Sequence, residues 1–208
     1  MTATIRQRVP IAMNRAEGRT AQLATFRGLA DEGEHFACVI GPLPAVPLVR
    51  VHSECVTGDV LGSTRCDCGP QLDEAMKQLA AEGGILLYLR QEGRGIGLYN
   101  KIDTYHLQDR QIDTFRANEL IGRGADERRY DVAAQMLQAL GADRVELLTN
   151  NPDKVAQLRS LGIEVVAERT TSVHLTAANA QYLKAKREYG HELHSTELGM
   201  APPRSATA

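Results

Sequence analysis

The sequence has no strong excess of charge of either sign. It carries 24 Lys and Arg residues against 26 Asp and Glu residues, a formal net charge of −2, and the two signs are interspersed. Proteins that bind nucleic acid or membrane surfaces usually concentrate basic side chains, and this balance gives no indication of that. We therefore expect neither nucleic acid nor membrane as a partner.

Long apolar runs are also missing. The longest strongly apolar run, residues 85–89, is far too short to span a bilayer. The first ten residues, MTATIRQRVP, lack the apolar core of a secretory signal. These two absences predict a cytoplasmic protein.

Cysteine is scarce, yet three of the four cysteines fall in one short segment, HSECVTGDVLGSTRCDCG (52–69). They are Cys55, Cys66 and Cys68. In a reducing compartment, clustered thiols indicate metal binding or catalysis before they indicate disulfides. Zinc prefers tetrahedral thiolate and imidazole ligands, and three protein ligands leave one position open for water. The spacing is therefore compatible with a catalytic zinc site.

Other interpretations of the segment stay open on spacing alone. His52 or Cys38 could supply a fourth ligand and make the site structural, or the thiols could be redox-active or simply packed. Cys38, within an apolar stretch, is typical of a small buried hydrophobe. The zinc deaminase pattern, H-x-E followed by P-C-x-x-C, fits only in its first half, because Cys66 and Cys68 are one residue too close and no proline precedes them.

Hydrophobic periodicity and turn residues predict alternating strands and helices, which favours an α/β (mixed α+β) fold. We expect one compact domain over residues 1–194, with a divergent N-terminal part over 1–44, and a disordered tail over 195–208. Asn151 is a plausible N-cap for the helix that begins at Pro152, and Gly162 suits its end. The predicted strands span 35–41, 46–53, 84–89, 145–150 and 163–167, and the predicted helices 70–81, 98–108, 131–140 and 152–162.

Three polar segments could contact a phosphate, although each is weak evidence alone. RQEGRGIGLYN (90–100) has glycines that allow a close approach of the backbone, and Arg90 and Arg94 could neutralise phosphate. LLTNNPDK (147–154) places a lysine in the first turn of a helix, where backbone amides favour an anion. GADERRYD (124–131) combines an acid and a base before another helix. A glycine-rich turn, a capped helix and a charged loop are the alternative interpretations.

In this order, the segments resemble the GTP cyclohydrolase II family. The blocks that carry the resemblance include VRVHSEC, TGDV, STRCDCGPQL, GILLYLRQEGRGIGL, NKIDTYHLQD, DT-x-x-AN, ADERRYDVAAQML and LLTNNPDK, over roughly residues 45–195. The resemblance implies a mixed α/β catalytic domain, a homodimer and a place at the start of riboflavin biosynthesis. We find no sign of the dihydroxybutanone phosphate synthase domain that is often fused in this family.

The resemblance also assigns roles, residue by residue. It implies that Cys55, Cys66 and Cys68 bind one catalytic Zn²⁺ per subunit. Asp126 would accept a proton, Arg128 would attack the α-phosphate or stabilise charge there, and Tyr105 would contact the purine. The residues implied in GTP binding are Arg50, Val51, His52, Ser53, Glu54, Gln71, Glu92, Gly93, Arg94, Thr114, Thr149 and Lys154.

The reaction implied by the resemblance is hydrolysis of GTP to 2,5-diamino-6-ribosylamino-4(3H)-pyrimidinone 5′-phosphate, formate and pyrophosphate. Zinc lowers the pKa of bound water to about 7, and Mg²⁺ accompanies the triphosphate. Glu54, Gln71 or Glu92 could read guanine. Arg116 stands where the family commonly carries glutamate. A paralogue of secondary metabolism that stops at a formamide product, and a non-catalytic GTP-binding relative, are the alternatives.

Overall fold

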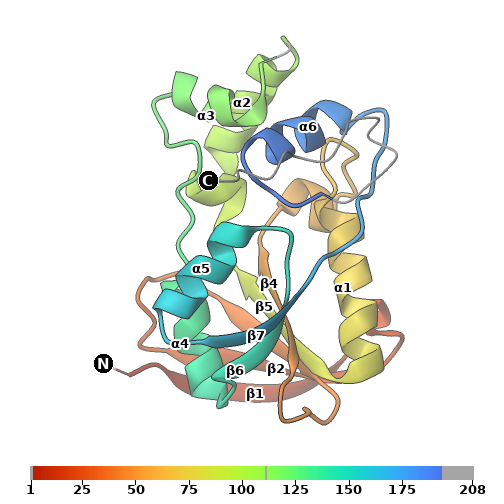
Figure 1. Cartoon of the computed structure of the whole chain (residues 1–208), viewed down its shortest axis with the longest axis vertical. Coiled ribbons are helices and arrows are strands. Elements are labelled where there is room, and N and C mark those ends of the chain that lie inside the picture. The colour runs from red at the N-terminus through yellow and green to blue at the C-terminus, as the bar shows by residue number, and fades with distance from the viewer. Residues whose placement is uncertain (1, 111, 194–208) are drawn as a thin grey trace, which may run out of the picture.

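A computed structural model describes residues 2–110 and 112–193 of the chain. The tail that we expect to be disordered, 195–208, lies outside the described residues. One seven-stranded sheet forms the centre, with helices around it (Figure 1). The strands are β1 (Thr4–Ala12), β2 (Thr20–Arg27), β3 (Phe36–Ile40), β4 (Leu48–Ser53), β5 (Gly84–Leu89), β6 (Arg144–Leu148) and β7 (Glu164–Arg169).

The helices continue the alternation that the sequence predicts. The α-helices are α1 (Cys68–Glu82), α2 (Leu98–Gln108), α3 (Thr114–Leu120), α4 (Asp131–Leu140), α5 (Pro152–Ser160) and α6 (Ala180–Glu188). Three shorter helical turns are η1 (Asn14–Ala16), η2 (Val56–Val60) and η3 (Glu92–Gly95). Asn151 caps α5 through its Oδ1, which accepts a hydrogen bond from the Asp153 amide at 3.1 Å, and Gly141 ends α4 in the left-handed region. The α/β prediction is confirmed.

The strand order, β1-β2-β3-β5-β4-β6-β7, divides the sheet into two halves. β1, β2, β3 and β5 pair antiparallel, whereas β5, β4, β6 and β7 run parallel. In open sheets, ligands bind beyond the carboxyl ends of parallel strands, where the chain crosses to opposite sides. β4 is such a point, because β5 lies on one side of it and β6 on the other. Helices α2, α3 and α6 gather at one end of the sheet (Figure 1).

Side chains of the central strands alternate between two apolar clusters, as the pleat of a strand requires. Val49 and Val51 of β4 belong to the cluster that includes residues of α4 and α5, whereas Leu48 belongs to the cluster that includes α1. Each fully buried aliphatic side chain stabilises the fold by about 1.5–3 kcal/mol. Cys38 is 2 % exposed within the α1 cluster, which confirms it as a buried hydrophobe.

The N-terminal hairpin of β1 and β2 was not predicted. Nearly every side chain of β1 is exposed, because this strand lies at the edge of the sheet. A strand that buries neither face shows no alternation of apolar and polar residues, and that alternation is the main sequence signal for a strand. The boundaries of α3 and α6 were not predicted either, because helices of seven and nine residues are too short to show a clear helical period.

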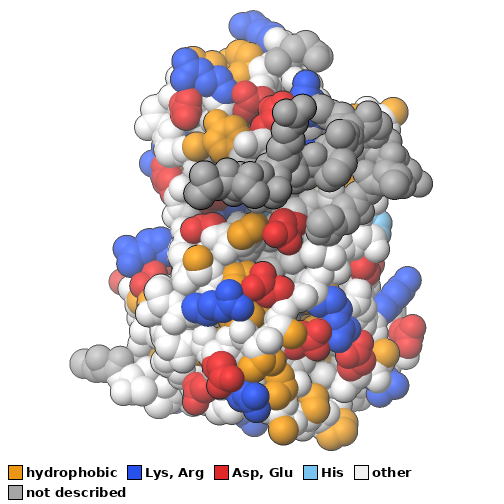
Figure 2. Space-filling model, viewed as in Figure 1, with side chains coloured by type: hydrophobic (Ala, Val, Ile, Leu, Met, Phe, Trp, Pro, Cys, Tyr) orange, Lys and Arg blue, Asp and Glu red, His pale blue; other side chains and the backbone are white. Residues whose placement is uncertain are grey.

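The surface matches the balanced composition. Figure 2 shows acidic and basic side chains interspersed on the visible face. Among the described residues, no helix combines the length and apolar character that a membrane span requires.

Candidate functional site

One cavity at the carboxyl ends of β4, β5 and β6 brings the predicted residues together. All predicted site residues except Asp126 line it, although they come from segments more than 100 residues apart. The sequence analysis missed several other residues of the lining: Arg65, Ile96, Lys101, Thr104, Gln108, Asn118, Asn150, Asn151, Tyr182, Lys186 and His191.

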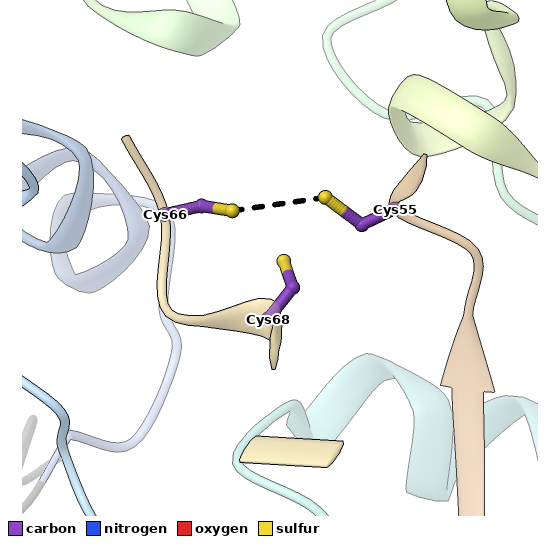
Figure 3. Close-up of side chains that lie close together, drawn as sticks. All are labelled: Cys55, Cys66 and Cys68. Carbon is purple, nitrogen blue, oxygen red and sulfur yellow. Dashed lines mark hydrogen bonds between the residues drawn. The ribbon is translucent and has the colours of Figure 1, made fainter. Parts of the chain in front are cut away.

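Cys55, Cys66 and Cys68 form a thiol cluster in the wall of this cavity. Cys55 follows β4, Cys66 lies in the next loop and Cys68 begins α1, and the three side chains point toward one another (Figure 3). Their sulfur atoms lie within 4.8 Å of one another, and Cys55 Sγ lies 3.6 Å from Cys66 Sγ. Tetrahedral zinc with bonds near 2.3 Å separates its sulfur ligands by roughly 3.8 Å. The spacing therefore suits a single tetrahedral ion.

Without a bound cation, the three thiols of the cluster do not all lose their protons easily. Hydrogen bonds from Cys66 and Cys68, with help from the Lys101 ammonium, hold the pKa of Cys55 far below its usual range. The thiolate of Cys55 in turn raises the pKa of Cys66 to about 11, and Cys55, Cys66 and burial raise the pKa of Cys68 well above its usual value. One negative charge is thus favoured and two more are opposed. A divalent cation at the centre would remove that repulsion, since metal binding deprotonates its thiol ligands.

Space beside the sulfur atoms is kept open by Gly58 of η2. A Cβ atom at this position would lie 3.0 Å from Cys66 Sγ and 3.1 Å from Cys55 Sγ. Any side chain at this position would crowd the thiol cluster. The glycine of the TGDV block therefore leaves room for a ligand beside the three sulfur atoms. The donor set and this open space fit a zinc ion.

His52 contacts Asp59 and not the thiol cluster. Its Nε2 lies 3.0 Å from Asp59 Oδ2, which also accepts hydrogen bonds from the Cys55 amide and the Tyr88 hydroxyl. Burial lowers the pKa of His52, so the imidazole is neutral. Among residues 2–110 and 112–193, the group of side chains within ligating distance consists of three cysteines. Neither His52 nor Cys38 closes the cluster.

Lys101 of α2 connects the thiol cluster with Glu92. Its Nζ donates to Cys55 Sγ at 3.1 Å and to Glu92 Oε1 at 2.8 Å. The other carboxylate oxygen of Glu92 accepts from the Val56 amide at 2.6 Å, and Oε1 also accepts from the Gly93 amide. Burial opposes the charge of Lys101, but the neighbouring Cys55 and Glu92 outweigh it and raise the pKa of the lysine. Lys101 is thus a fixed cation beside the first thiolate.

A second part of the cavity wall concentrates positive charge. We call this the cation cluster: Arg94, Arg128, Lys154 and Lys186, together with the neutral His191 among them, all of which line the cavity. Burial, followed by repulsion from Arg50, Arg128 and Lys186, holds the pKa of Lys154 well below its usual value. Burial and the four other members lower the pKa of His191 to about 3. Charges of one sign that converge in this way favour an anion of high charge.

Local structure fixes these cations. Arg94 adopts φ +60°, directly after Gly93 at φ +62°, and this unusual backbone turns its guanidinium onto the Phe115 ring, 4.0 Å from the centroid. Arg94 NH1 donates to Thr114 Oγ1 at 2.9 Å. Lys154, in the first turn of α5, donates to the Val51 carbonyl at 2.6 Å.

Asp126 lies beside Arg128 rather than in the cavity wall. The Nε atom of Arg128 donates to Asp126 Oδ1 at 2.8 Å, and a second bond joins its NH2 to Oδ2. Burial alone would raise the pKa of Asp126, but the hydrogen bonds and charge of Arg128 outweigh it and lower that pKa. Asp126 is therefore an ionised carboxylate that orients the guanidinium. Its role as a proton acceptor stays a prediction.

Tyr105 lies close to the thiol cluster. Its hydroxyl lies 3.0 Å from Thr57 Oγ1, and the Arg65 guanidinium stacks over its ring at 4.7 Å. Burial raises the pKa of Tyr105, so the hydroxyl remains protonated at neutral pH and can donate a hydrogen bond.

Two arginines lie outside the cavity. Arg90, a candidate for phosphate binding in the sequence, instead pairs with Glu54 at 2.9 Å and does not line the cavity. Arg116 pairs with Glu119 at 2.7 Å on an exposed face. Its departure from the family pattern is therefore a surface feature.

The missed lining residues carry little signal in the sequence. Lys101 and Lys186 lie in helices that also carry exposed charged residues, Asp103 in α2 and Lys184 in α6, and no local pattern distinguishes a lysine that faces a cavity from one that faces water. Lys101 does fall in the block NKIDTYHLQD, so its place near Tyr105 on the same helix was the available hint.

The chain is similar in sequence to known proteins of one family. The sequence model of the family described as GTP cyclohydrolase II matches residues 7–170. GTP cyclohydrolase-2 of Vibrio cholerae serotype O1 is 48% identical over 195 residues, which cover 92% of this chain and 98% of that protein. GTP cyclohydrolase-2 of Vibrio vulnificus is 48% identical over 191 residues, with 90% and 96% covered.

A longer relative matches over part of its length. The Riboflavin biosynthesis protein RibBA of Thermotoga maritima is 52% identical over 173 residues, which cover 83% of this chain and 45% of that protein. Both the family match and the near-complete coverage of the Vibrio proteins lead to one conclusion. The chain belongs to the GTP cyclohydrolase II family.

Proposed function

We propose that this protein hydrolyses GTP to 2,5-diamino-6-ribosylamino-4(3H)-pyrimidinone 5′-phosphate, formate and pyrophosphate, as the first committed step of riboflavin biosynthesis. The observation that carries the proposal is a single cavity lined by both a thiol cluster and a cation cluster. A purine ring that must be hydrolysed and a triphosphate that must be bound require these two chemistries together. Family membership and the names of the relatives support it.

On the ring side, Cys55, Cys66 and Cys68 would hold one Zn²⁺. When bound, the ion supplies a water nucleophile at neutral pH and polarises a carbonyl oxygen of the substrate. Hydrogen bonds from Cys66 and Cys68, with help from the Lys101 ammonium, keep Cys55 ionised and ready to ligate. The protonated Tyr105 hydroxyl lines the same cavity and would donate a hydrogen bond to the ring or to the departing formyl group.

On the phosphate side, the cation cluster would bind the triphosphate together with Mg²⁺. Burial opposes the charge of Arg128, but Tyr130 and Asp126 outweigh it and raise its pKa, so the guanidinium stays protonated. A protonated guanidinium is a poor nucleophile. We therefore favour charge stabilisation at the α-phosphate over direct attack as the role of Arg128.

For the guanine base, Glu54 is the best candidate of the three acidic and amide side chains. Gln71 uses its amide for Asp67 and its oxygen for Arg50, at 2.5 and 2.9 Å. Both oxygens of Glu92 are occupied by Lys101 and backbone amides. Glu54 accepts from Arg90 through one oxygen and lines the cavity. Its carboxylate could accept the N1-H and 2-amino donors that distinguish guanine from adenine.

Cytoplasmic location and a homodimer complete the proposal. The four cysteines are free in the structure, and thiolate ligands persist in a reducing compartment. The long edge strand β1 offers an unpaired sheet edge to a second copy, and Val9 and Ile11 on it are each 38 % exposed. Light scattering of the purified protein would give the mass of the assembly, and a monomer at micromolar concentration would contradict this part.

The decisive test is product analysis by mass spectrometry. Zinc-loaded protein is incubated with GTP and Mg²⁺, with ATP as the control nucleotide. We expect formate, pyrophosphate and the diaminopyrimidine in equal amounts from GTP, and none from ATP. A formamide-retaining product would favour the specialised paralogue. Unchanged GTP would overturn the proposal and favour a binding protein.

A further inference from the structure

Helix α6 contributes a buried ion pair to the wall of the cavity. Lys186 Nζ lies 3.2 Å from Asp67 Oδ1, and the two side chains are only 11% and 0% exposed. Asp67 stands between two members of the thiol cluster, Cys66 and Cys68. The ion pair thus joins the last helix of the chain to the segment that carries two of the proposed zinc ligands, 119 residues earlier.

Asp67 stands at the N-cap position of α1 but does not cap the helix with its side chain. It is the residue before α1, where an aspartate usually caps the helix by accepting a backbone N–H bond. Its side chain makes no such cap here. Instead, Oδ2 accepts from Gln71 Nε2 at 2.5 Å, and Oδ1 faces Lys186. The carboxylate is therefore directed into a side-chain network at the expense of a cap.

The network continues to the opposite side of the cavity wall. Gln71 Oε1 accepts from Arg50 NH2 at 2.9 Å, and Arg50 NH1 donates to the Leu148 carbonyl at 3.1 Å. Four buried side chains, from α6, the cysteine loop, α1 and β4, form one hydrogen-bonded row that ends on β6. Asp67, Gln71 and Arg50 each contact a partner on both sides in this row. Lys186, at its end, has a second contact, because its Nζ lies 5.3 Å from the Tyr182 ring centroid.

Removing one member would leave a charge without its partner in a buried position. A buried carboxylate without its cation is costly, so the segment around it would shift to reach water. For Asp67 such a shift must move Cys66 or Cys68, because they are its neighbours in the chain. For Gln71 and Arg50 it would alter the surface where GTP is proposed to bind.

We propose that Lys186 is a positioning residue, which fixes the Cys66-Asp67-Cys68 segment through Asp67 and aligns it with Gln71 and Arg50. This inference rests on the proposed zinc site. For zinc binding, Lys186 acts through Asp67 and is not itself a ligand, whatever it adds to the charge of the cation cluster. Partners that orient metal ligands from outside typically matter about 10- to 100-fold for metal affinity or activity.

The test compares Lys186→Met with Lys184→Met in the full-length protein. Lys184 lies on the same helix, pairs loosely with Glu188 at 4.0 Å and is 60 % exposed, so it is a matched control. Zinc affinity is measured by competition with a chromophoric chelator, without substrate. We expect Lys186→Met to weaken zinc binding about 10- to 100-fold and Lys184→Met to leave it unchanged.

Two further variants separate positioning from simple misfolding. Lys186→Arg keeps the charge and should restore most of the zinc affinity. The double variant Asp67→Asn with Lys186→Met removes both charges, so it avoids a lone buried carboxylate, yet it breaks the row and should still bind zinc more weakly than wild type. Circular dichroism checks that each variant is folded.

The outcomes distinguish the inference from the proposal beneath it. Wild-type zinc affinity in folded Lys186→Met, or in the double variant, would overturn the positioning role alone. A wild-type protein that binds no zinc would overturn the proposed function and the positioning role together. Weakened binding in Lys186→Met with rescue by Lys186→Arg supports both.

Discussion

The thiol cluster and the cation cluster line one cavity, and each brings together groups whose charges repel one another, negative in the first and positive in the second. The thiol cluster packs three groups that would all be negative as ligands, and it holds back two of its protons. The cation cluster packs arginine, lysine and histidine side chains, and the pKa values of Lys154 and His191 fall. In each case, a ligand of the opposite charge would relieve the repulsion. Each cluster is therefore arranged for a ligand of the opposite charge, at some cost to the stability of the ligand-free protein.

The clusters differ in how they are held. The thiol cluster sits on a loop between β4 and α1 and is braced by Lys101, Asp59 and Gly58. Members of the cation cluster come from η3, the segment before α4, α5, α6 and the residues after it. The first is therefore local in sequence, with all three ligands within 14 residues, whereas the second exists only after the chain has folded.

The largest effect is expected at the thiol cluster. Cys66→Ser removes one of three ligands and should abolish both zinc binding and formate release, because two thiolates cannot hold an open tetrahedral site tightly. Metal analysis and a formate assay check this. Cys38→Ala, at a cysteine buried elsewhere, is the control and should keep its zinc. Full formate release by metal-free Cys66→Ser would break the zinc mechanism.

The next effect belongs to the cation cluster. Arg128→Ala removes a fixed positive charge at the phosphate and should slow pyrophosphate release by about a hundredfold or more, with GTP binding still measurable. Stopped-flow pyrophosphate detection gives the rate. Arg129→Ala, at an adjacent arginine whose side chain is 82 % exposed, is the matched control. Unchanged pyrophosphate kinetics in Arg128→Ala would remove this residue from the reaction.

The pKa of His191, which burial lowers first and the neighbouring cations lower further, gives a test of the electrostatics of this part of the cavity. Its pKa in the folded protein is about 3, below the value of about 6.5 in an unfolded chain. The unfolded state therefore binds the proton first, and stability falls as pH drops below 6.5 by about 1.4 kcal/mol per pH unit. Between pH 6.5 and 5, wild type should lose about 2 kcal/mol more than His191→Gln does.

Urea unfolding at pH 7.5, 6.5 and 5 measures this difference. His106→Gln, at an exposed histidine of α2, serves as the control and should follow the wild-type curve. If wild type and His191→Gln lose stability in parallel, His191 does not feel the cation cluster, and the comparison between the two clusters weakens.

The smallest effect is expected at Arg116. Its side chain pairs with Glu119 on the surface, so Arg116→Glu should change kcat/KM for GTP by no more than about twofold and stability by no more than about 0.5 kcal/mol. Steady-state kinetics and thermal unfolding check this. A large change in kcat/KM would place the outer face of α3 within reach of the substrate.

The central elements could be predicted because their burial leaves a pattern. The strands that became β3 to β7 carry apolar runs bounded by turn residues, and the capping residues Asn151 and Gly141 mark helix ends. β1 gave no such pattern because it buries neither face. The site residues were predicted from their resemblance to family blocks, and their roles stay predictions. The cysteine cluster alone was visible from spacing.

The residue types and their short spacing are enough to reveal three close thiols, glycines that keep space free, and cations near helix starts. These follow from residue type and short spacing, which local structure preserves. Only the tertiary structure decided which lysines are functional candidates and which are solvated. Lys186 meets Asp67 across 119 residues, and Lys101 meets Cys55 across 46. Such pairings depend on how strands and helices pack. The sequence alone does not show which residues that are far apart in the chain come close together in space.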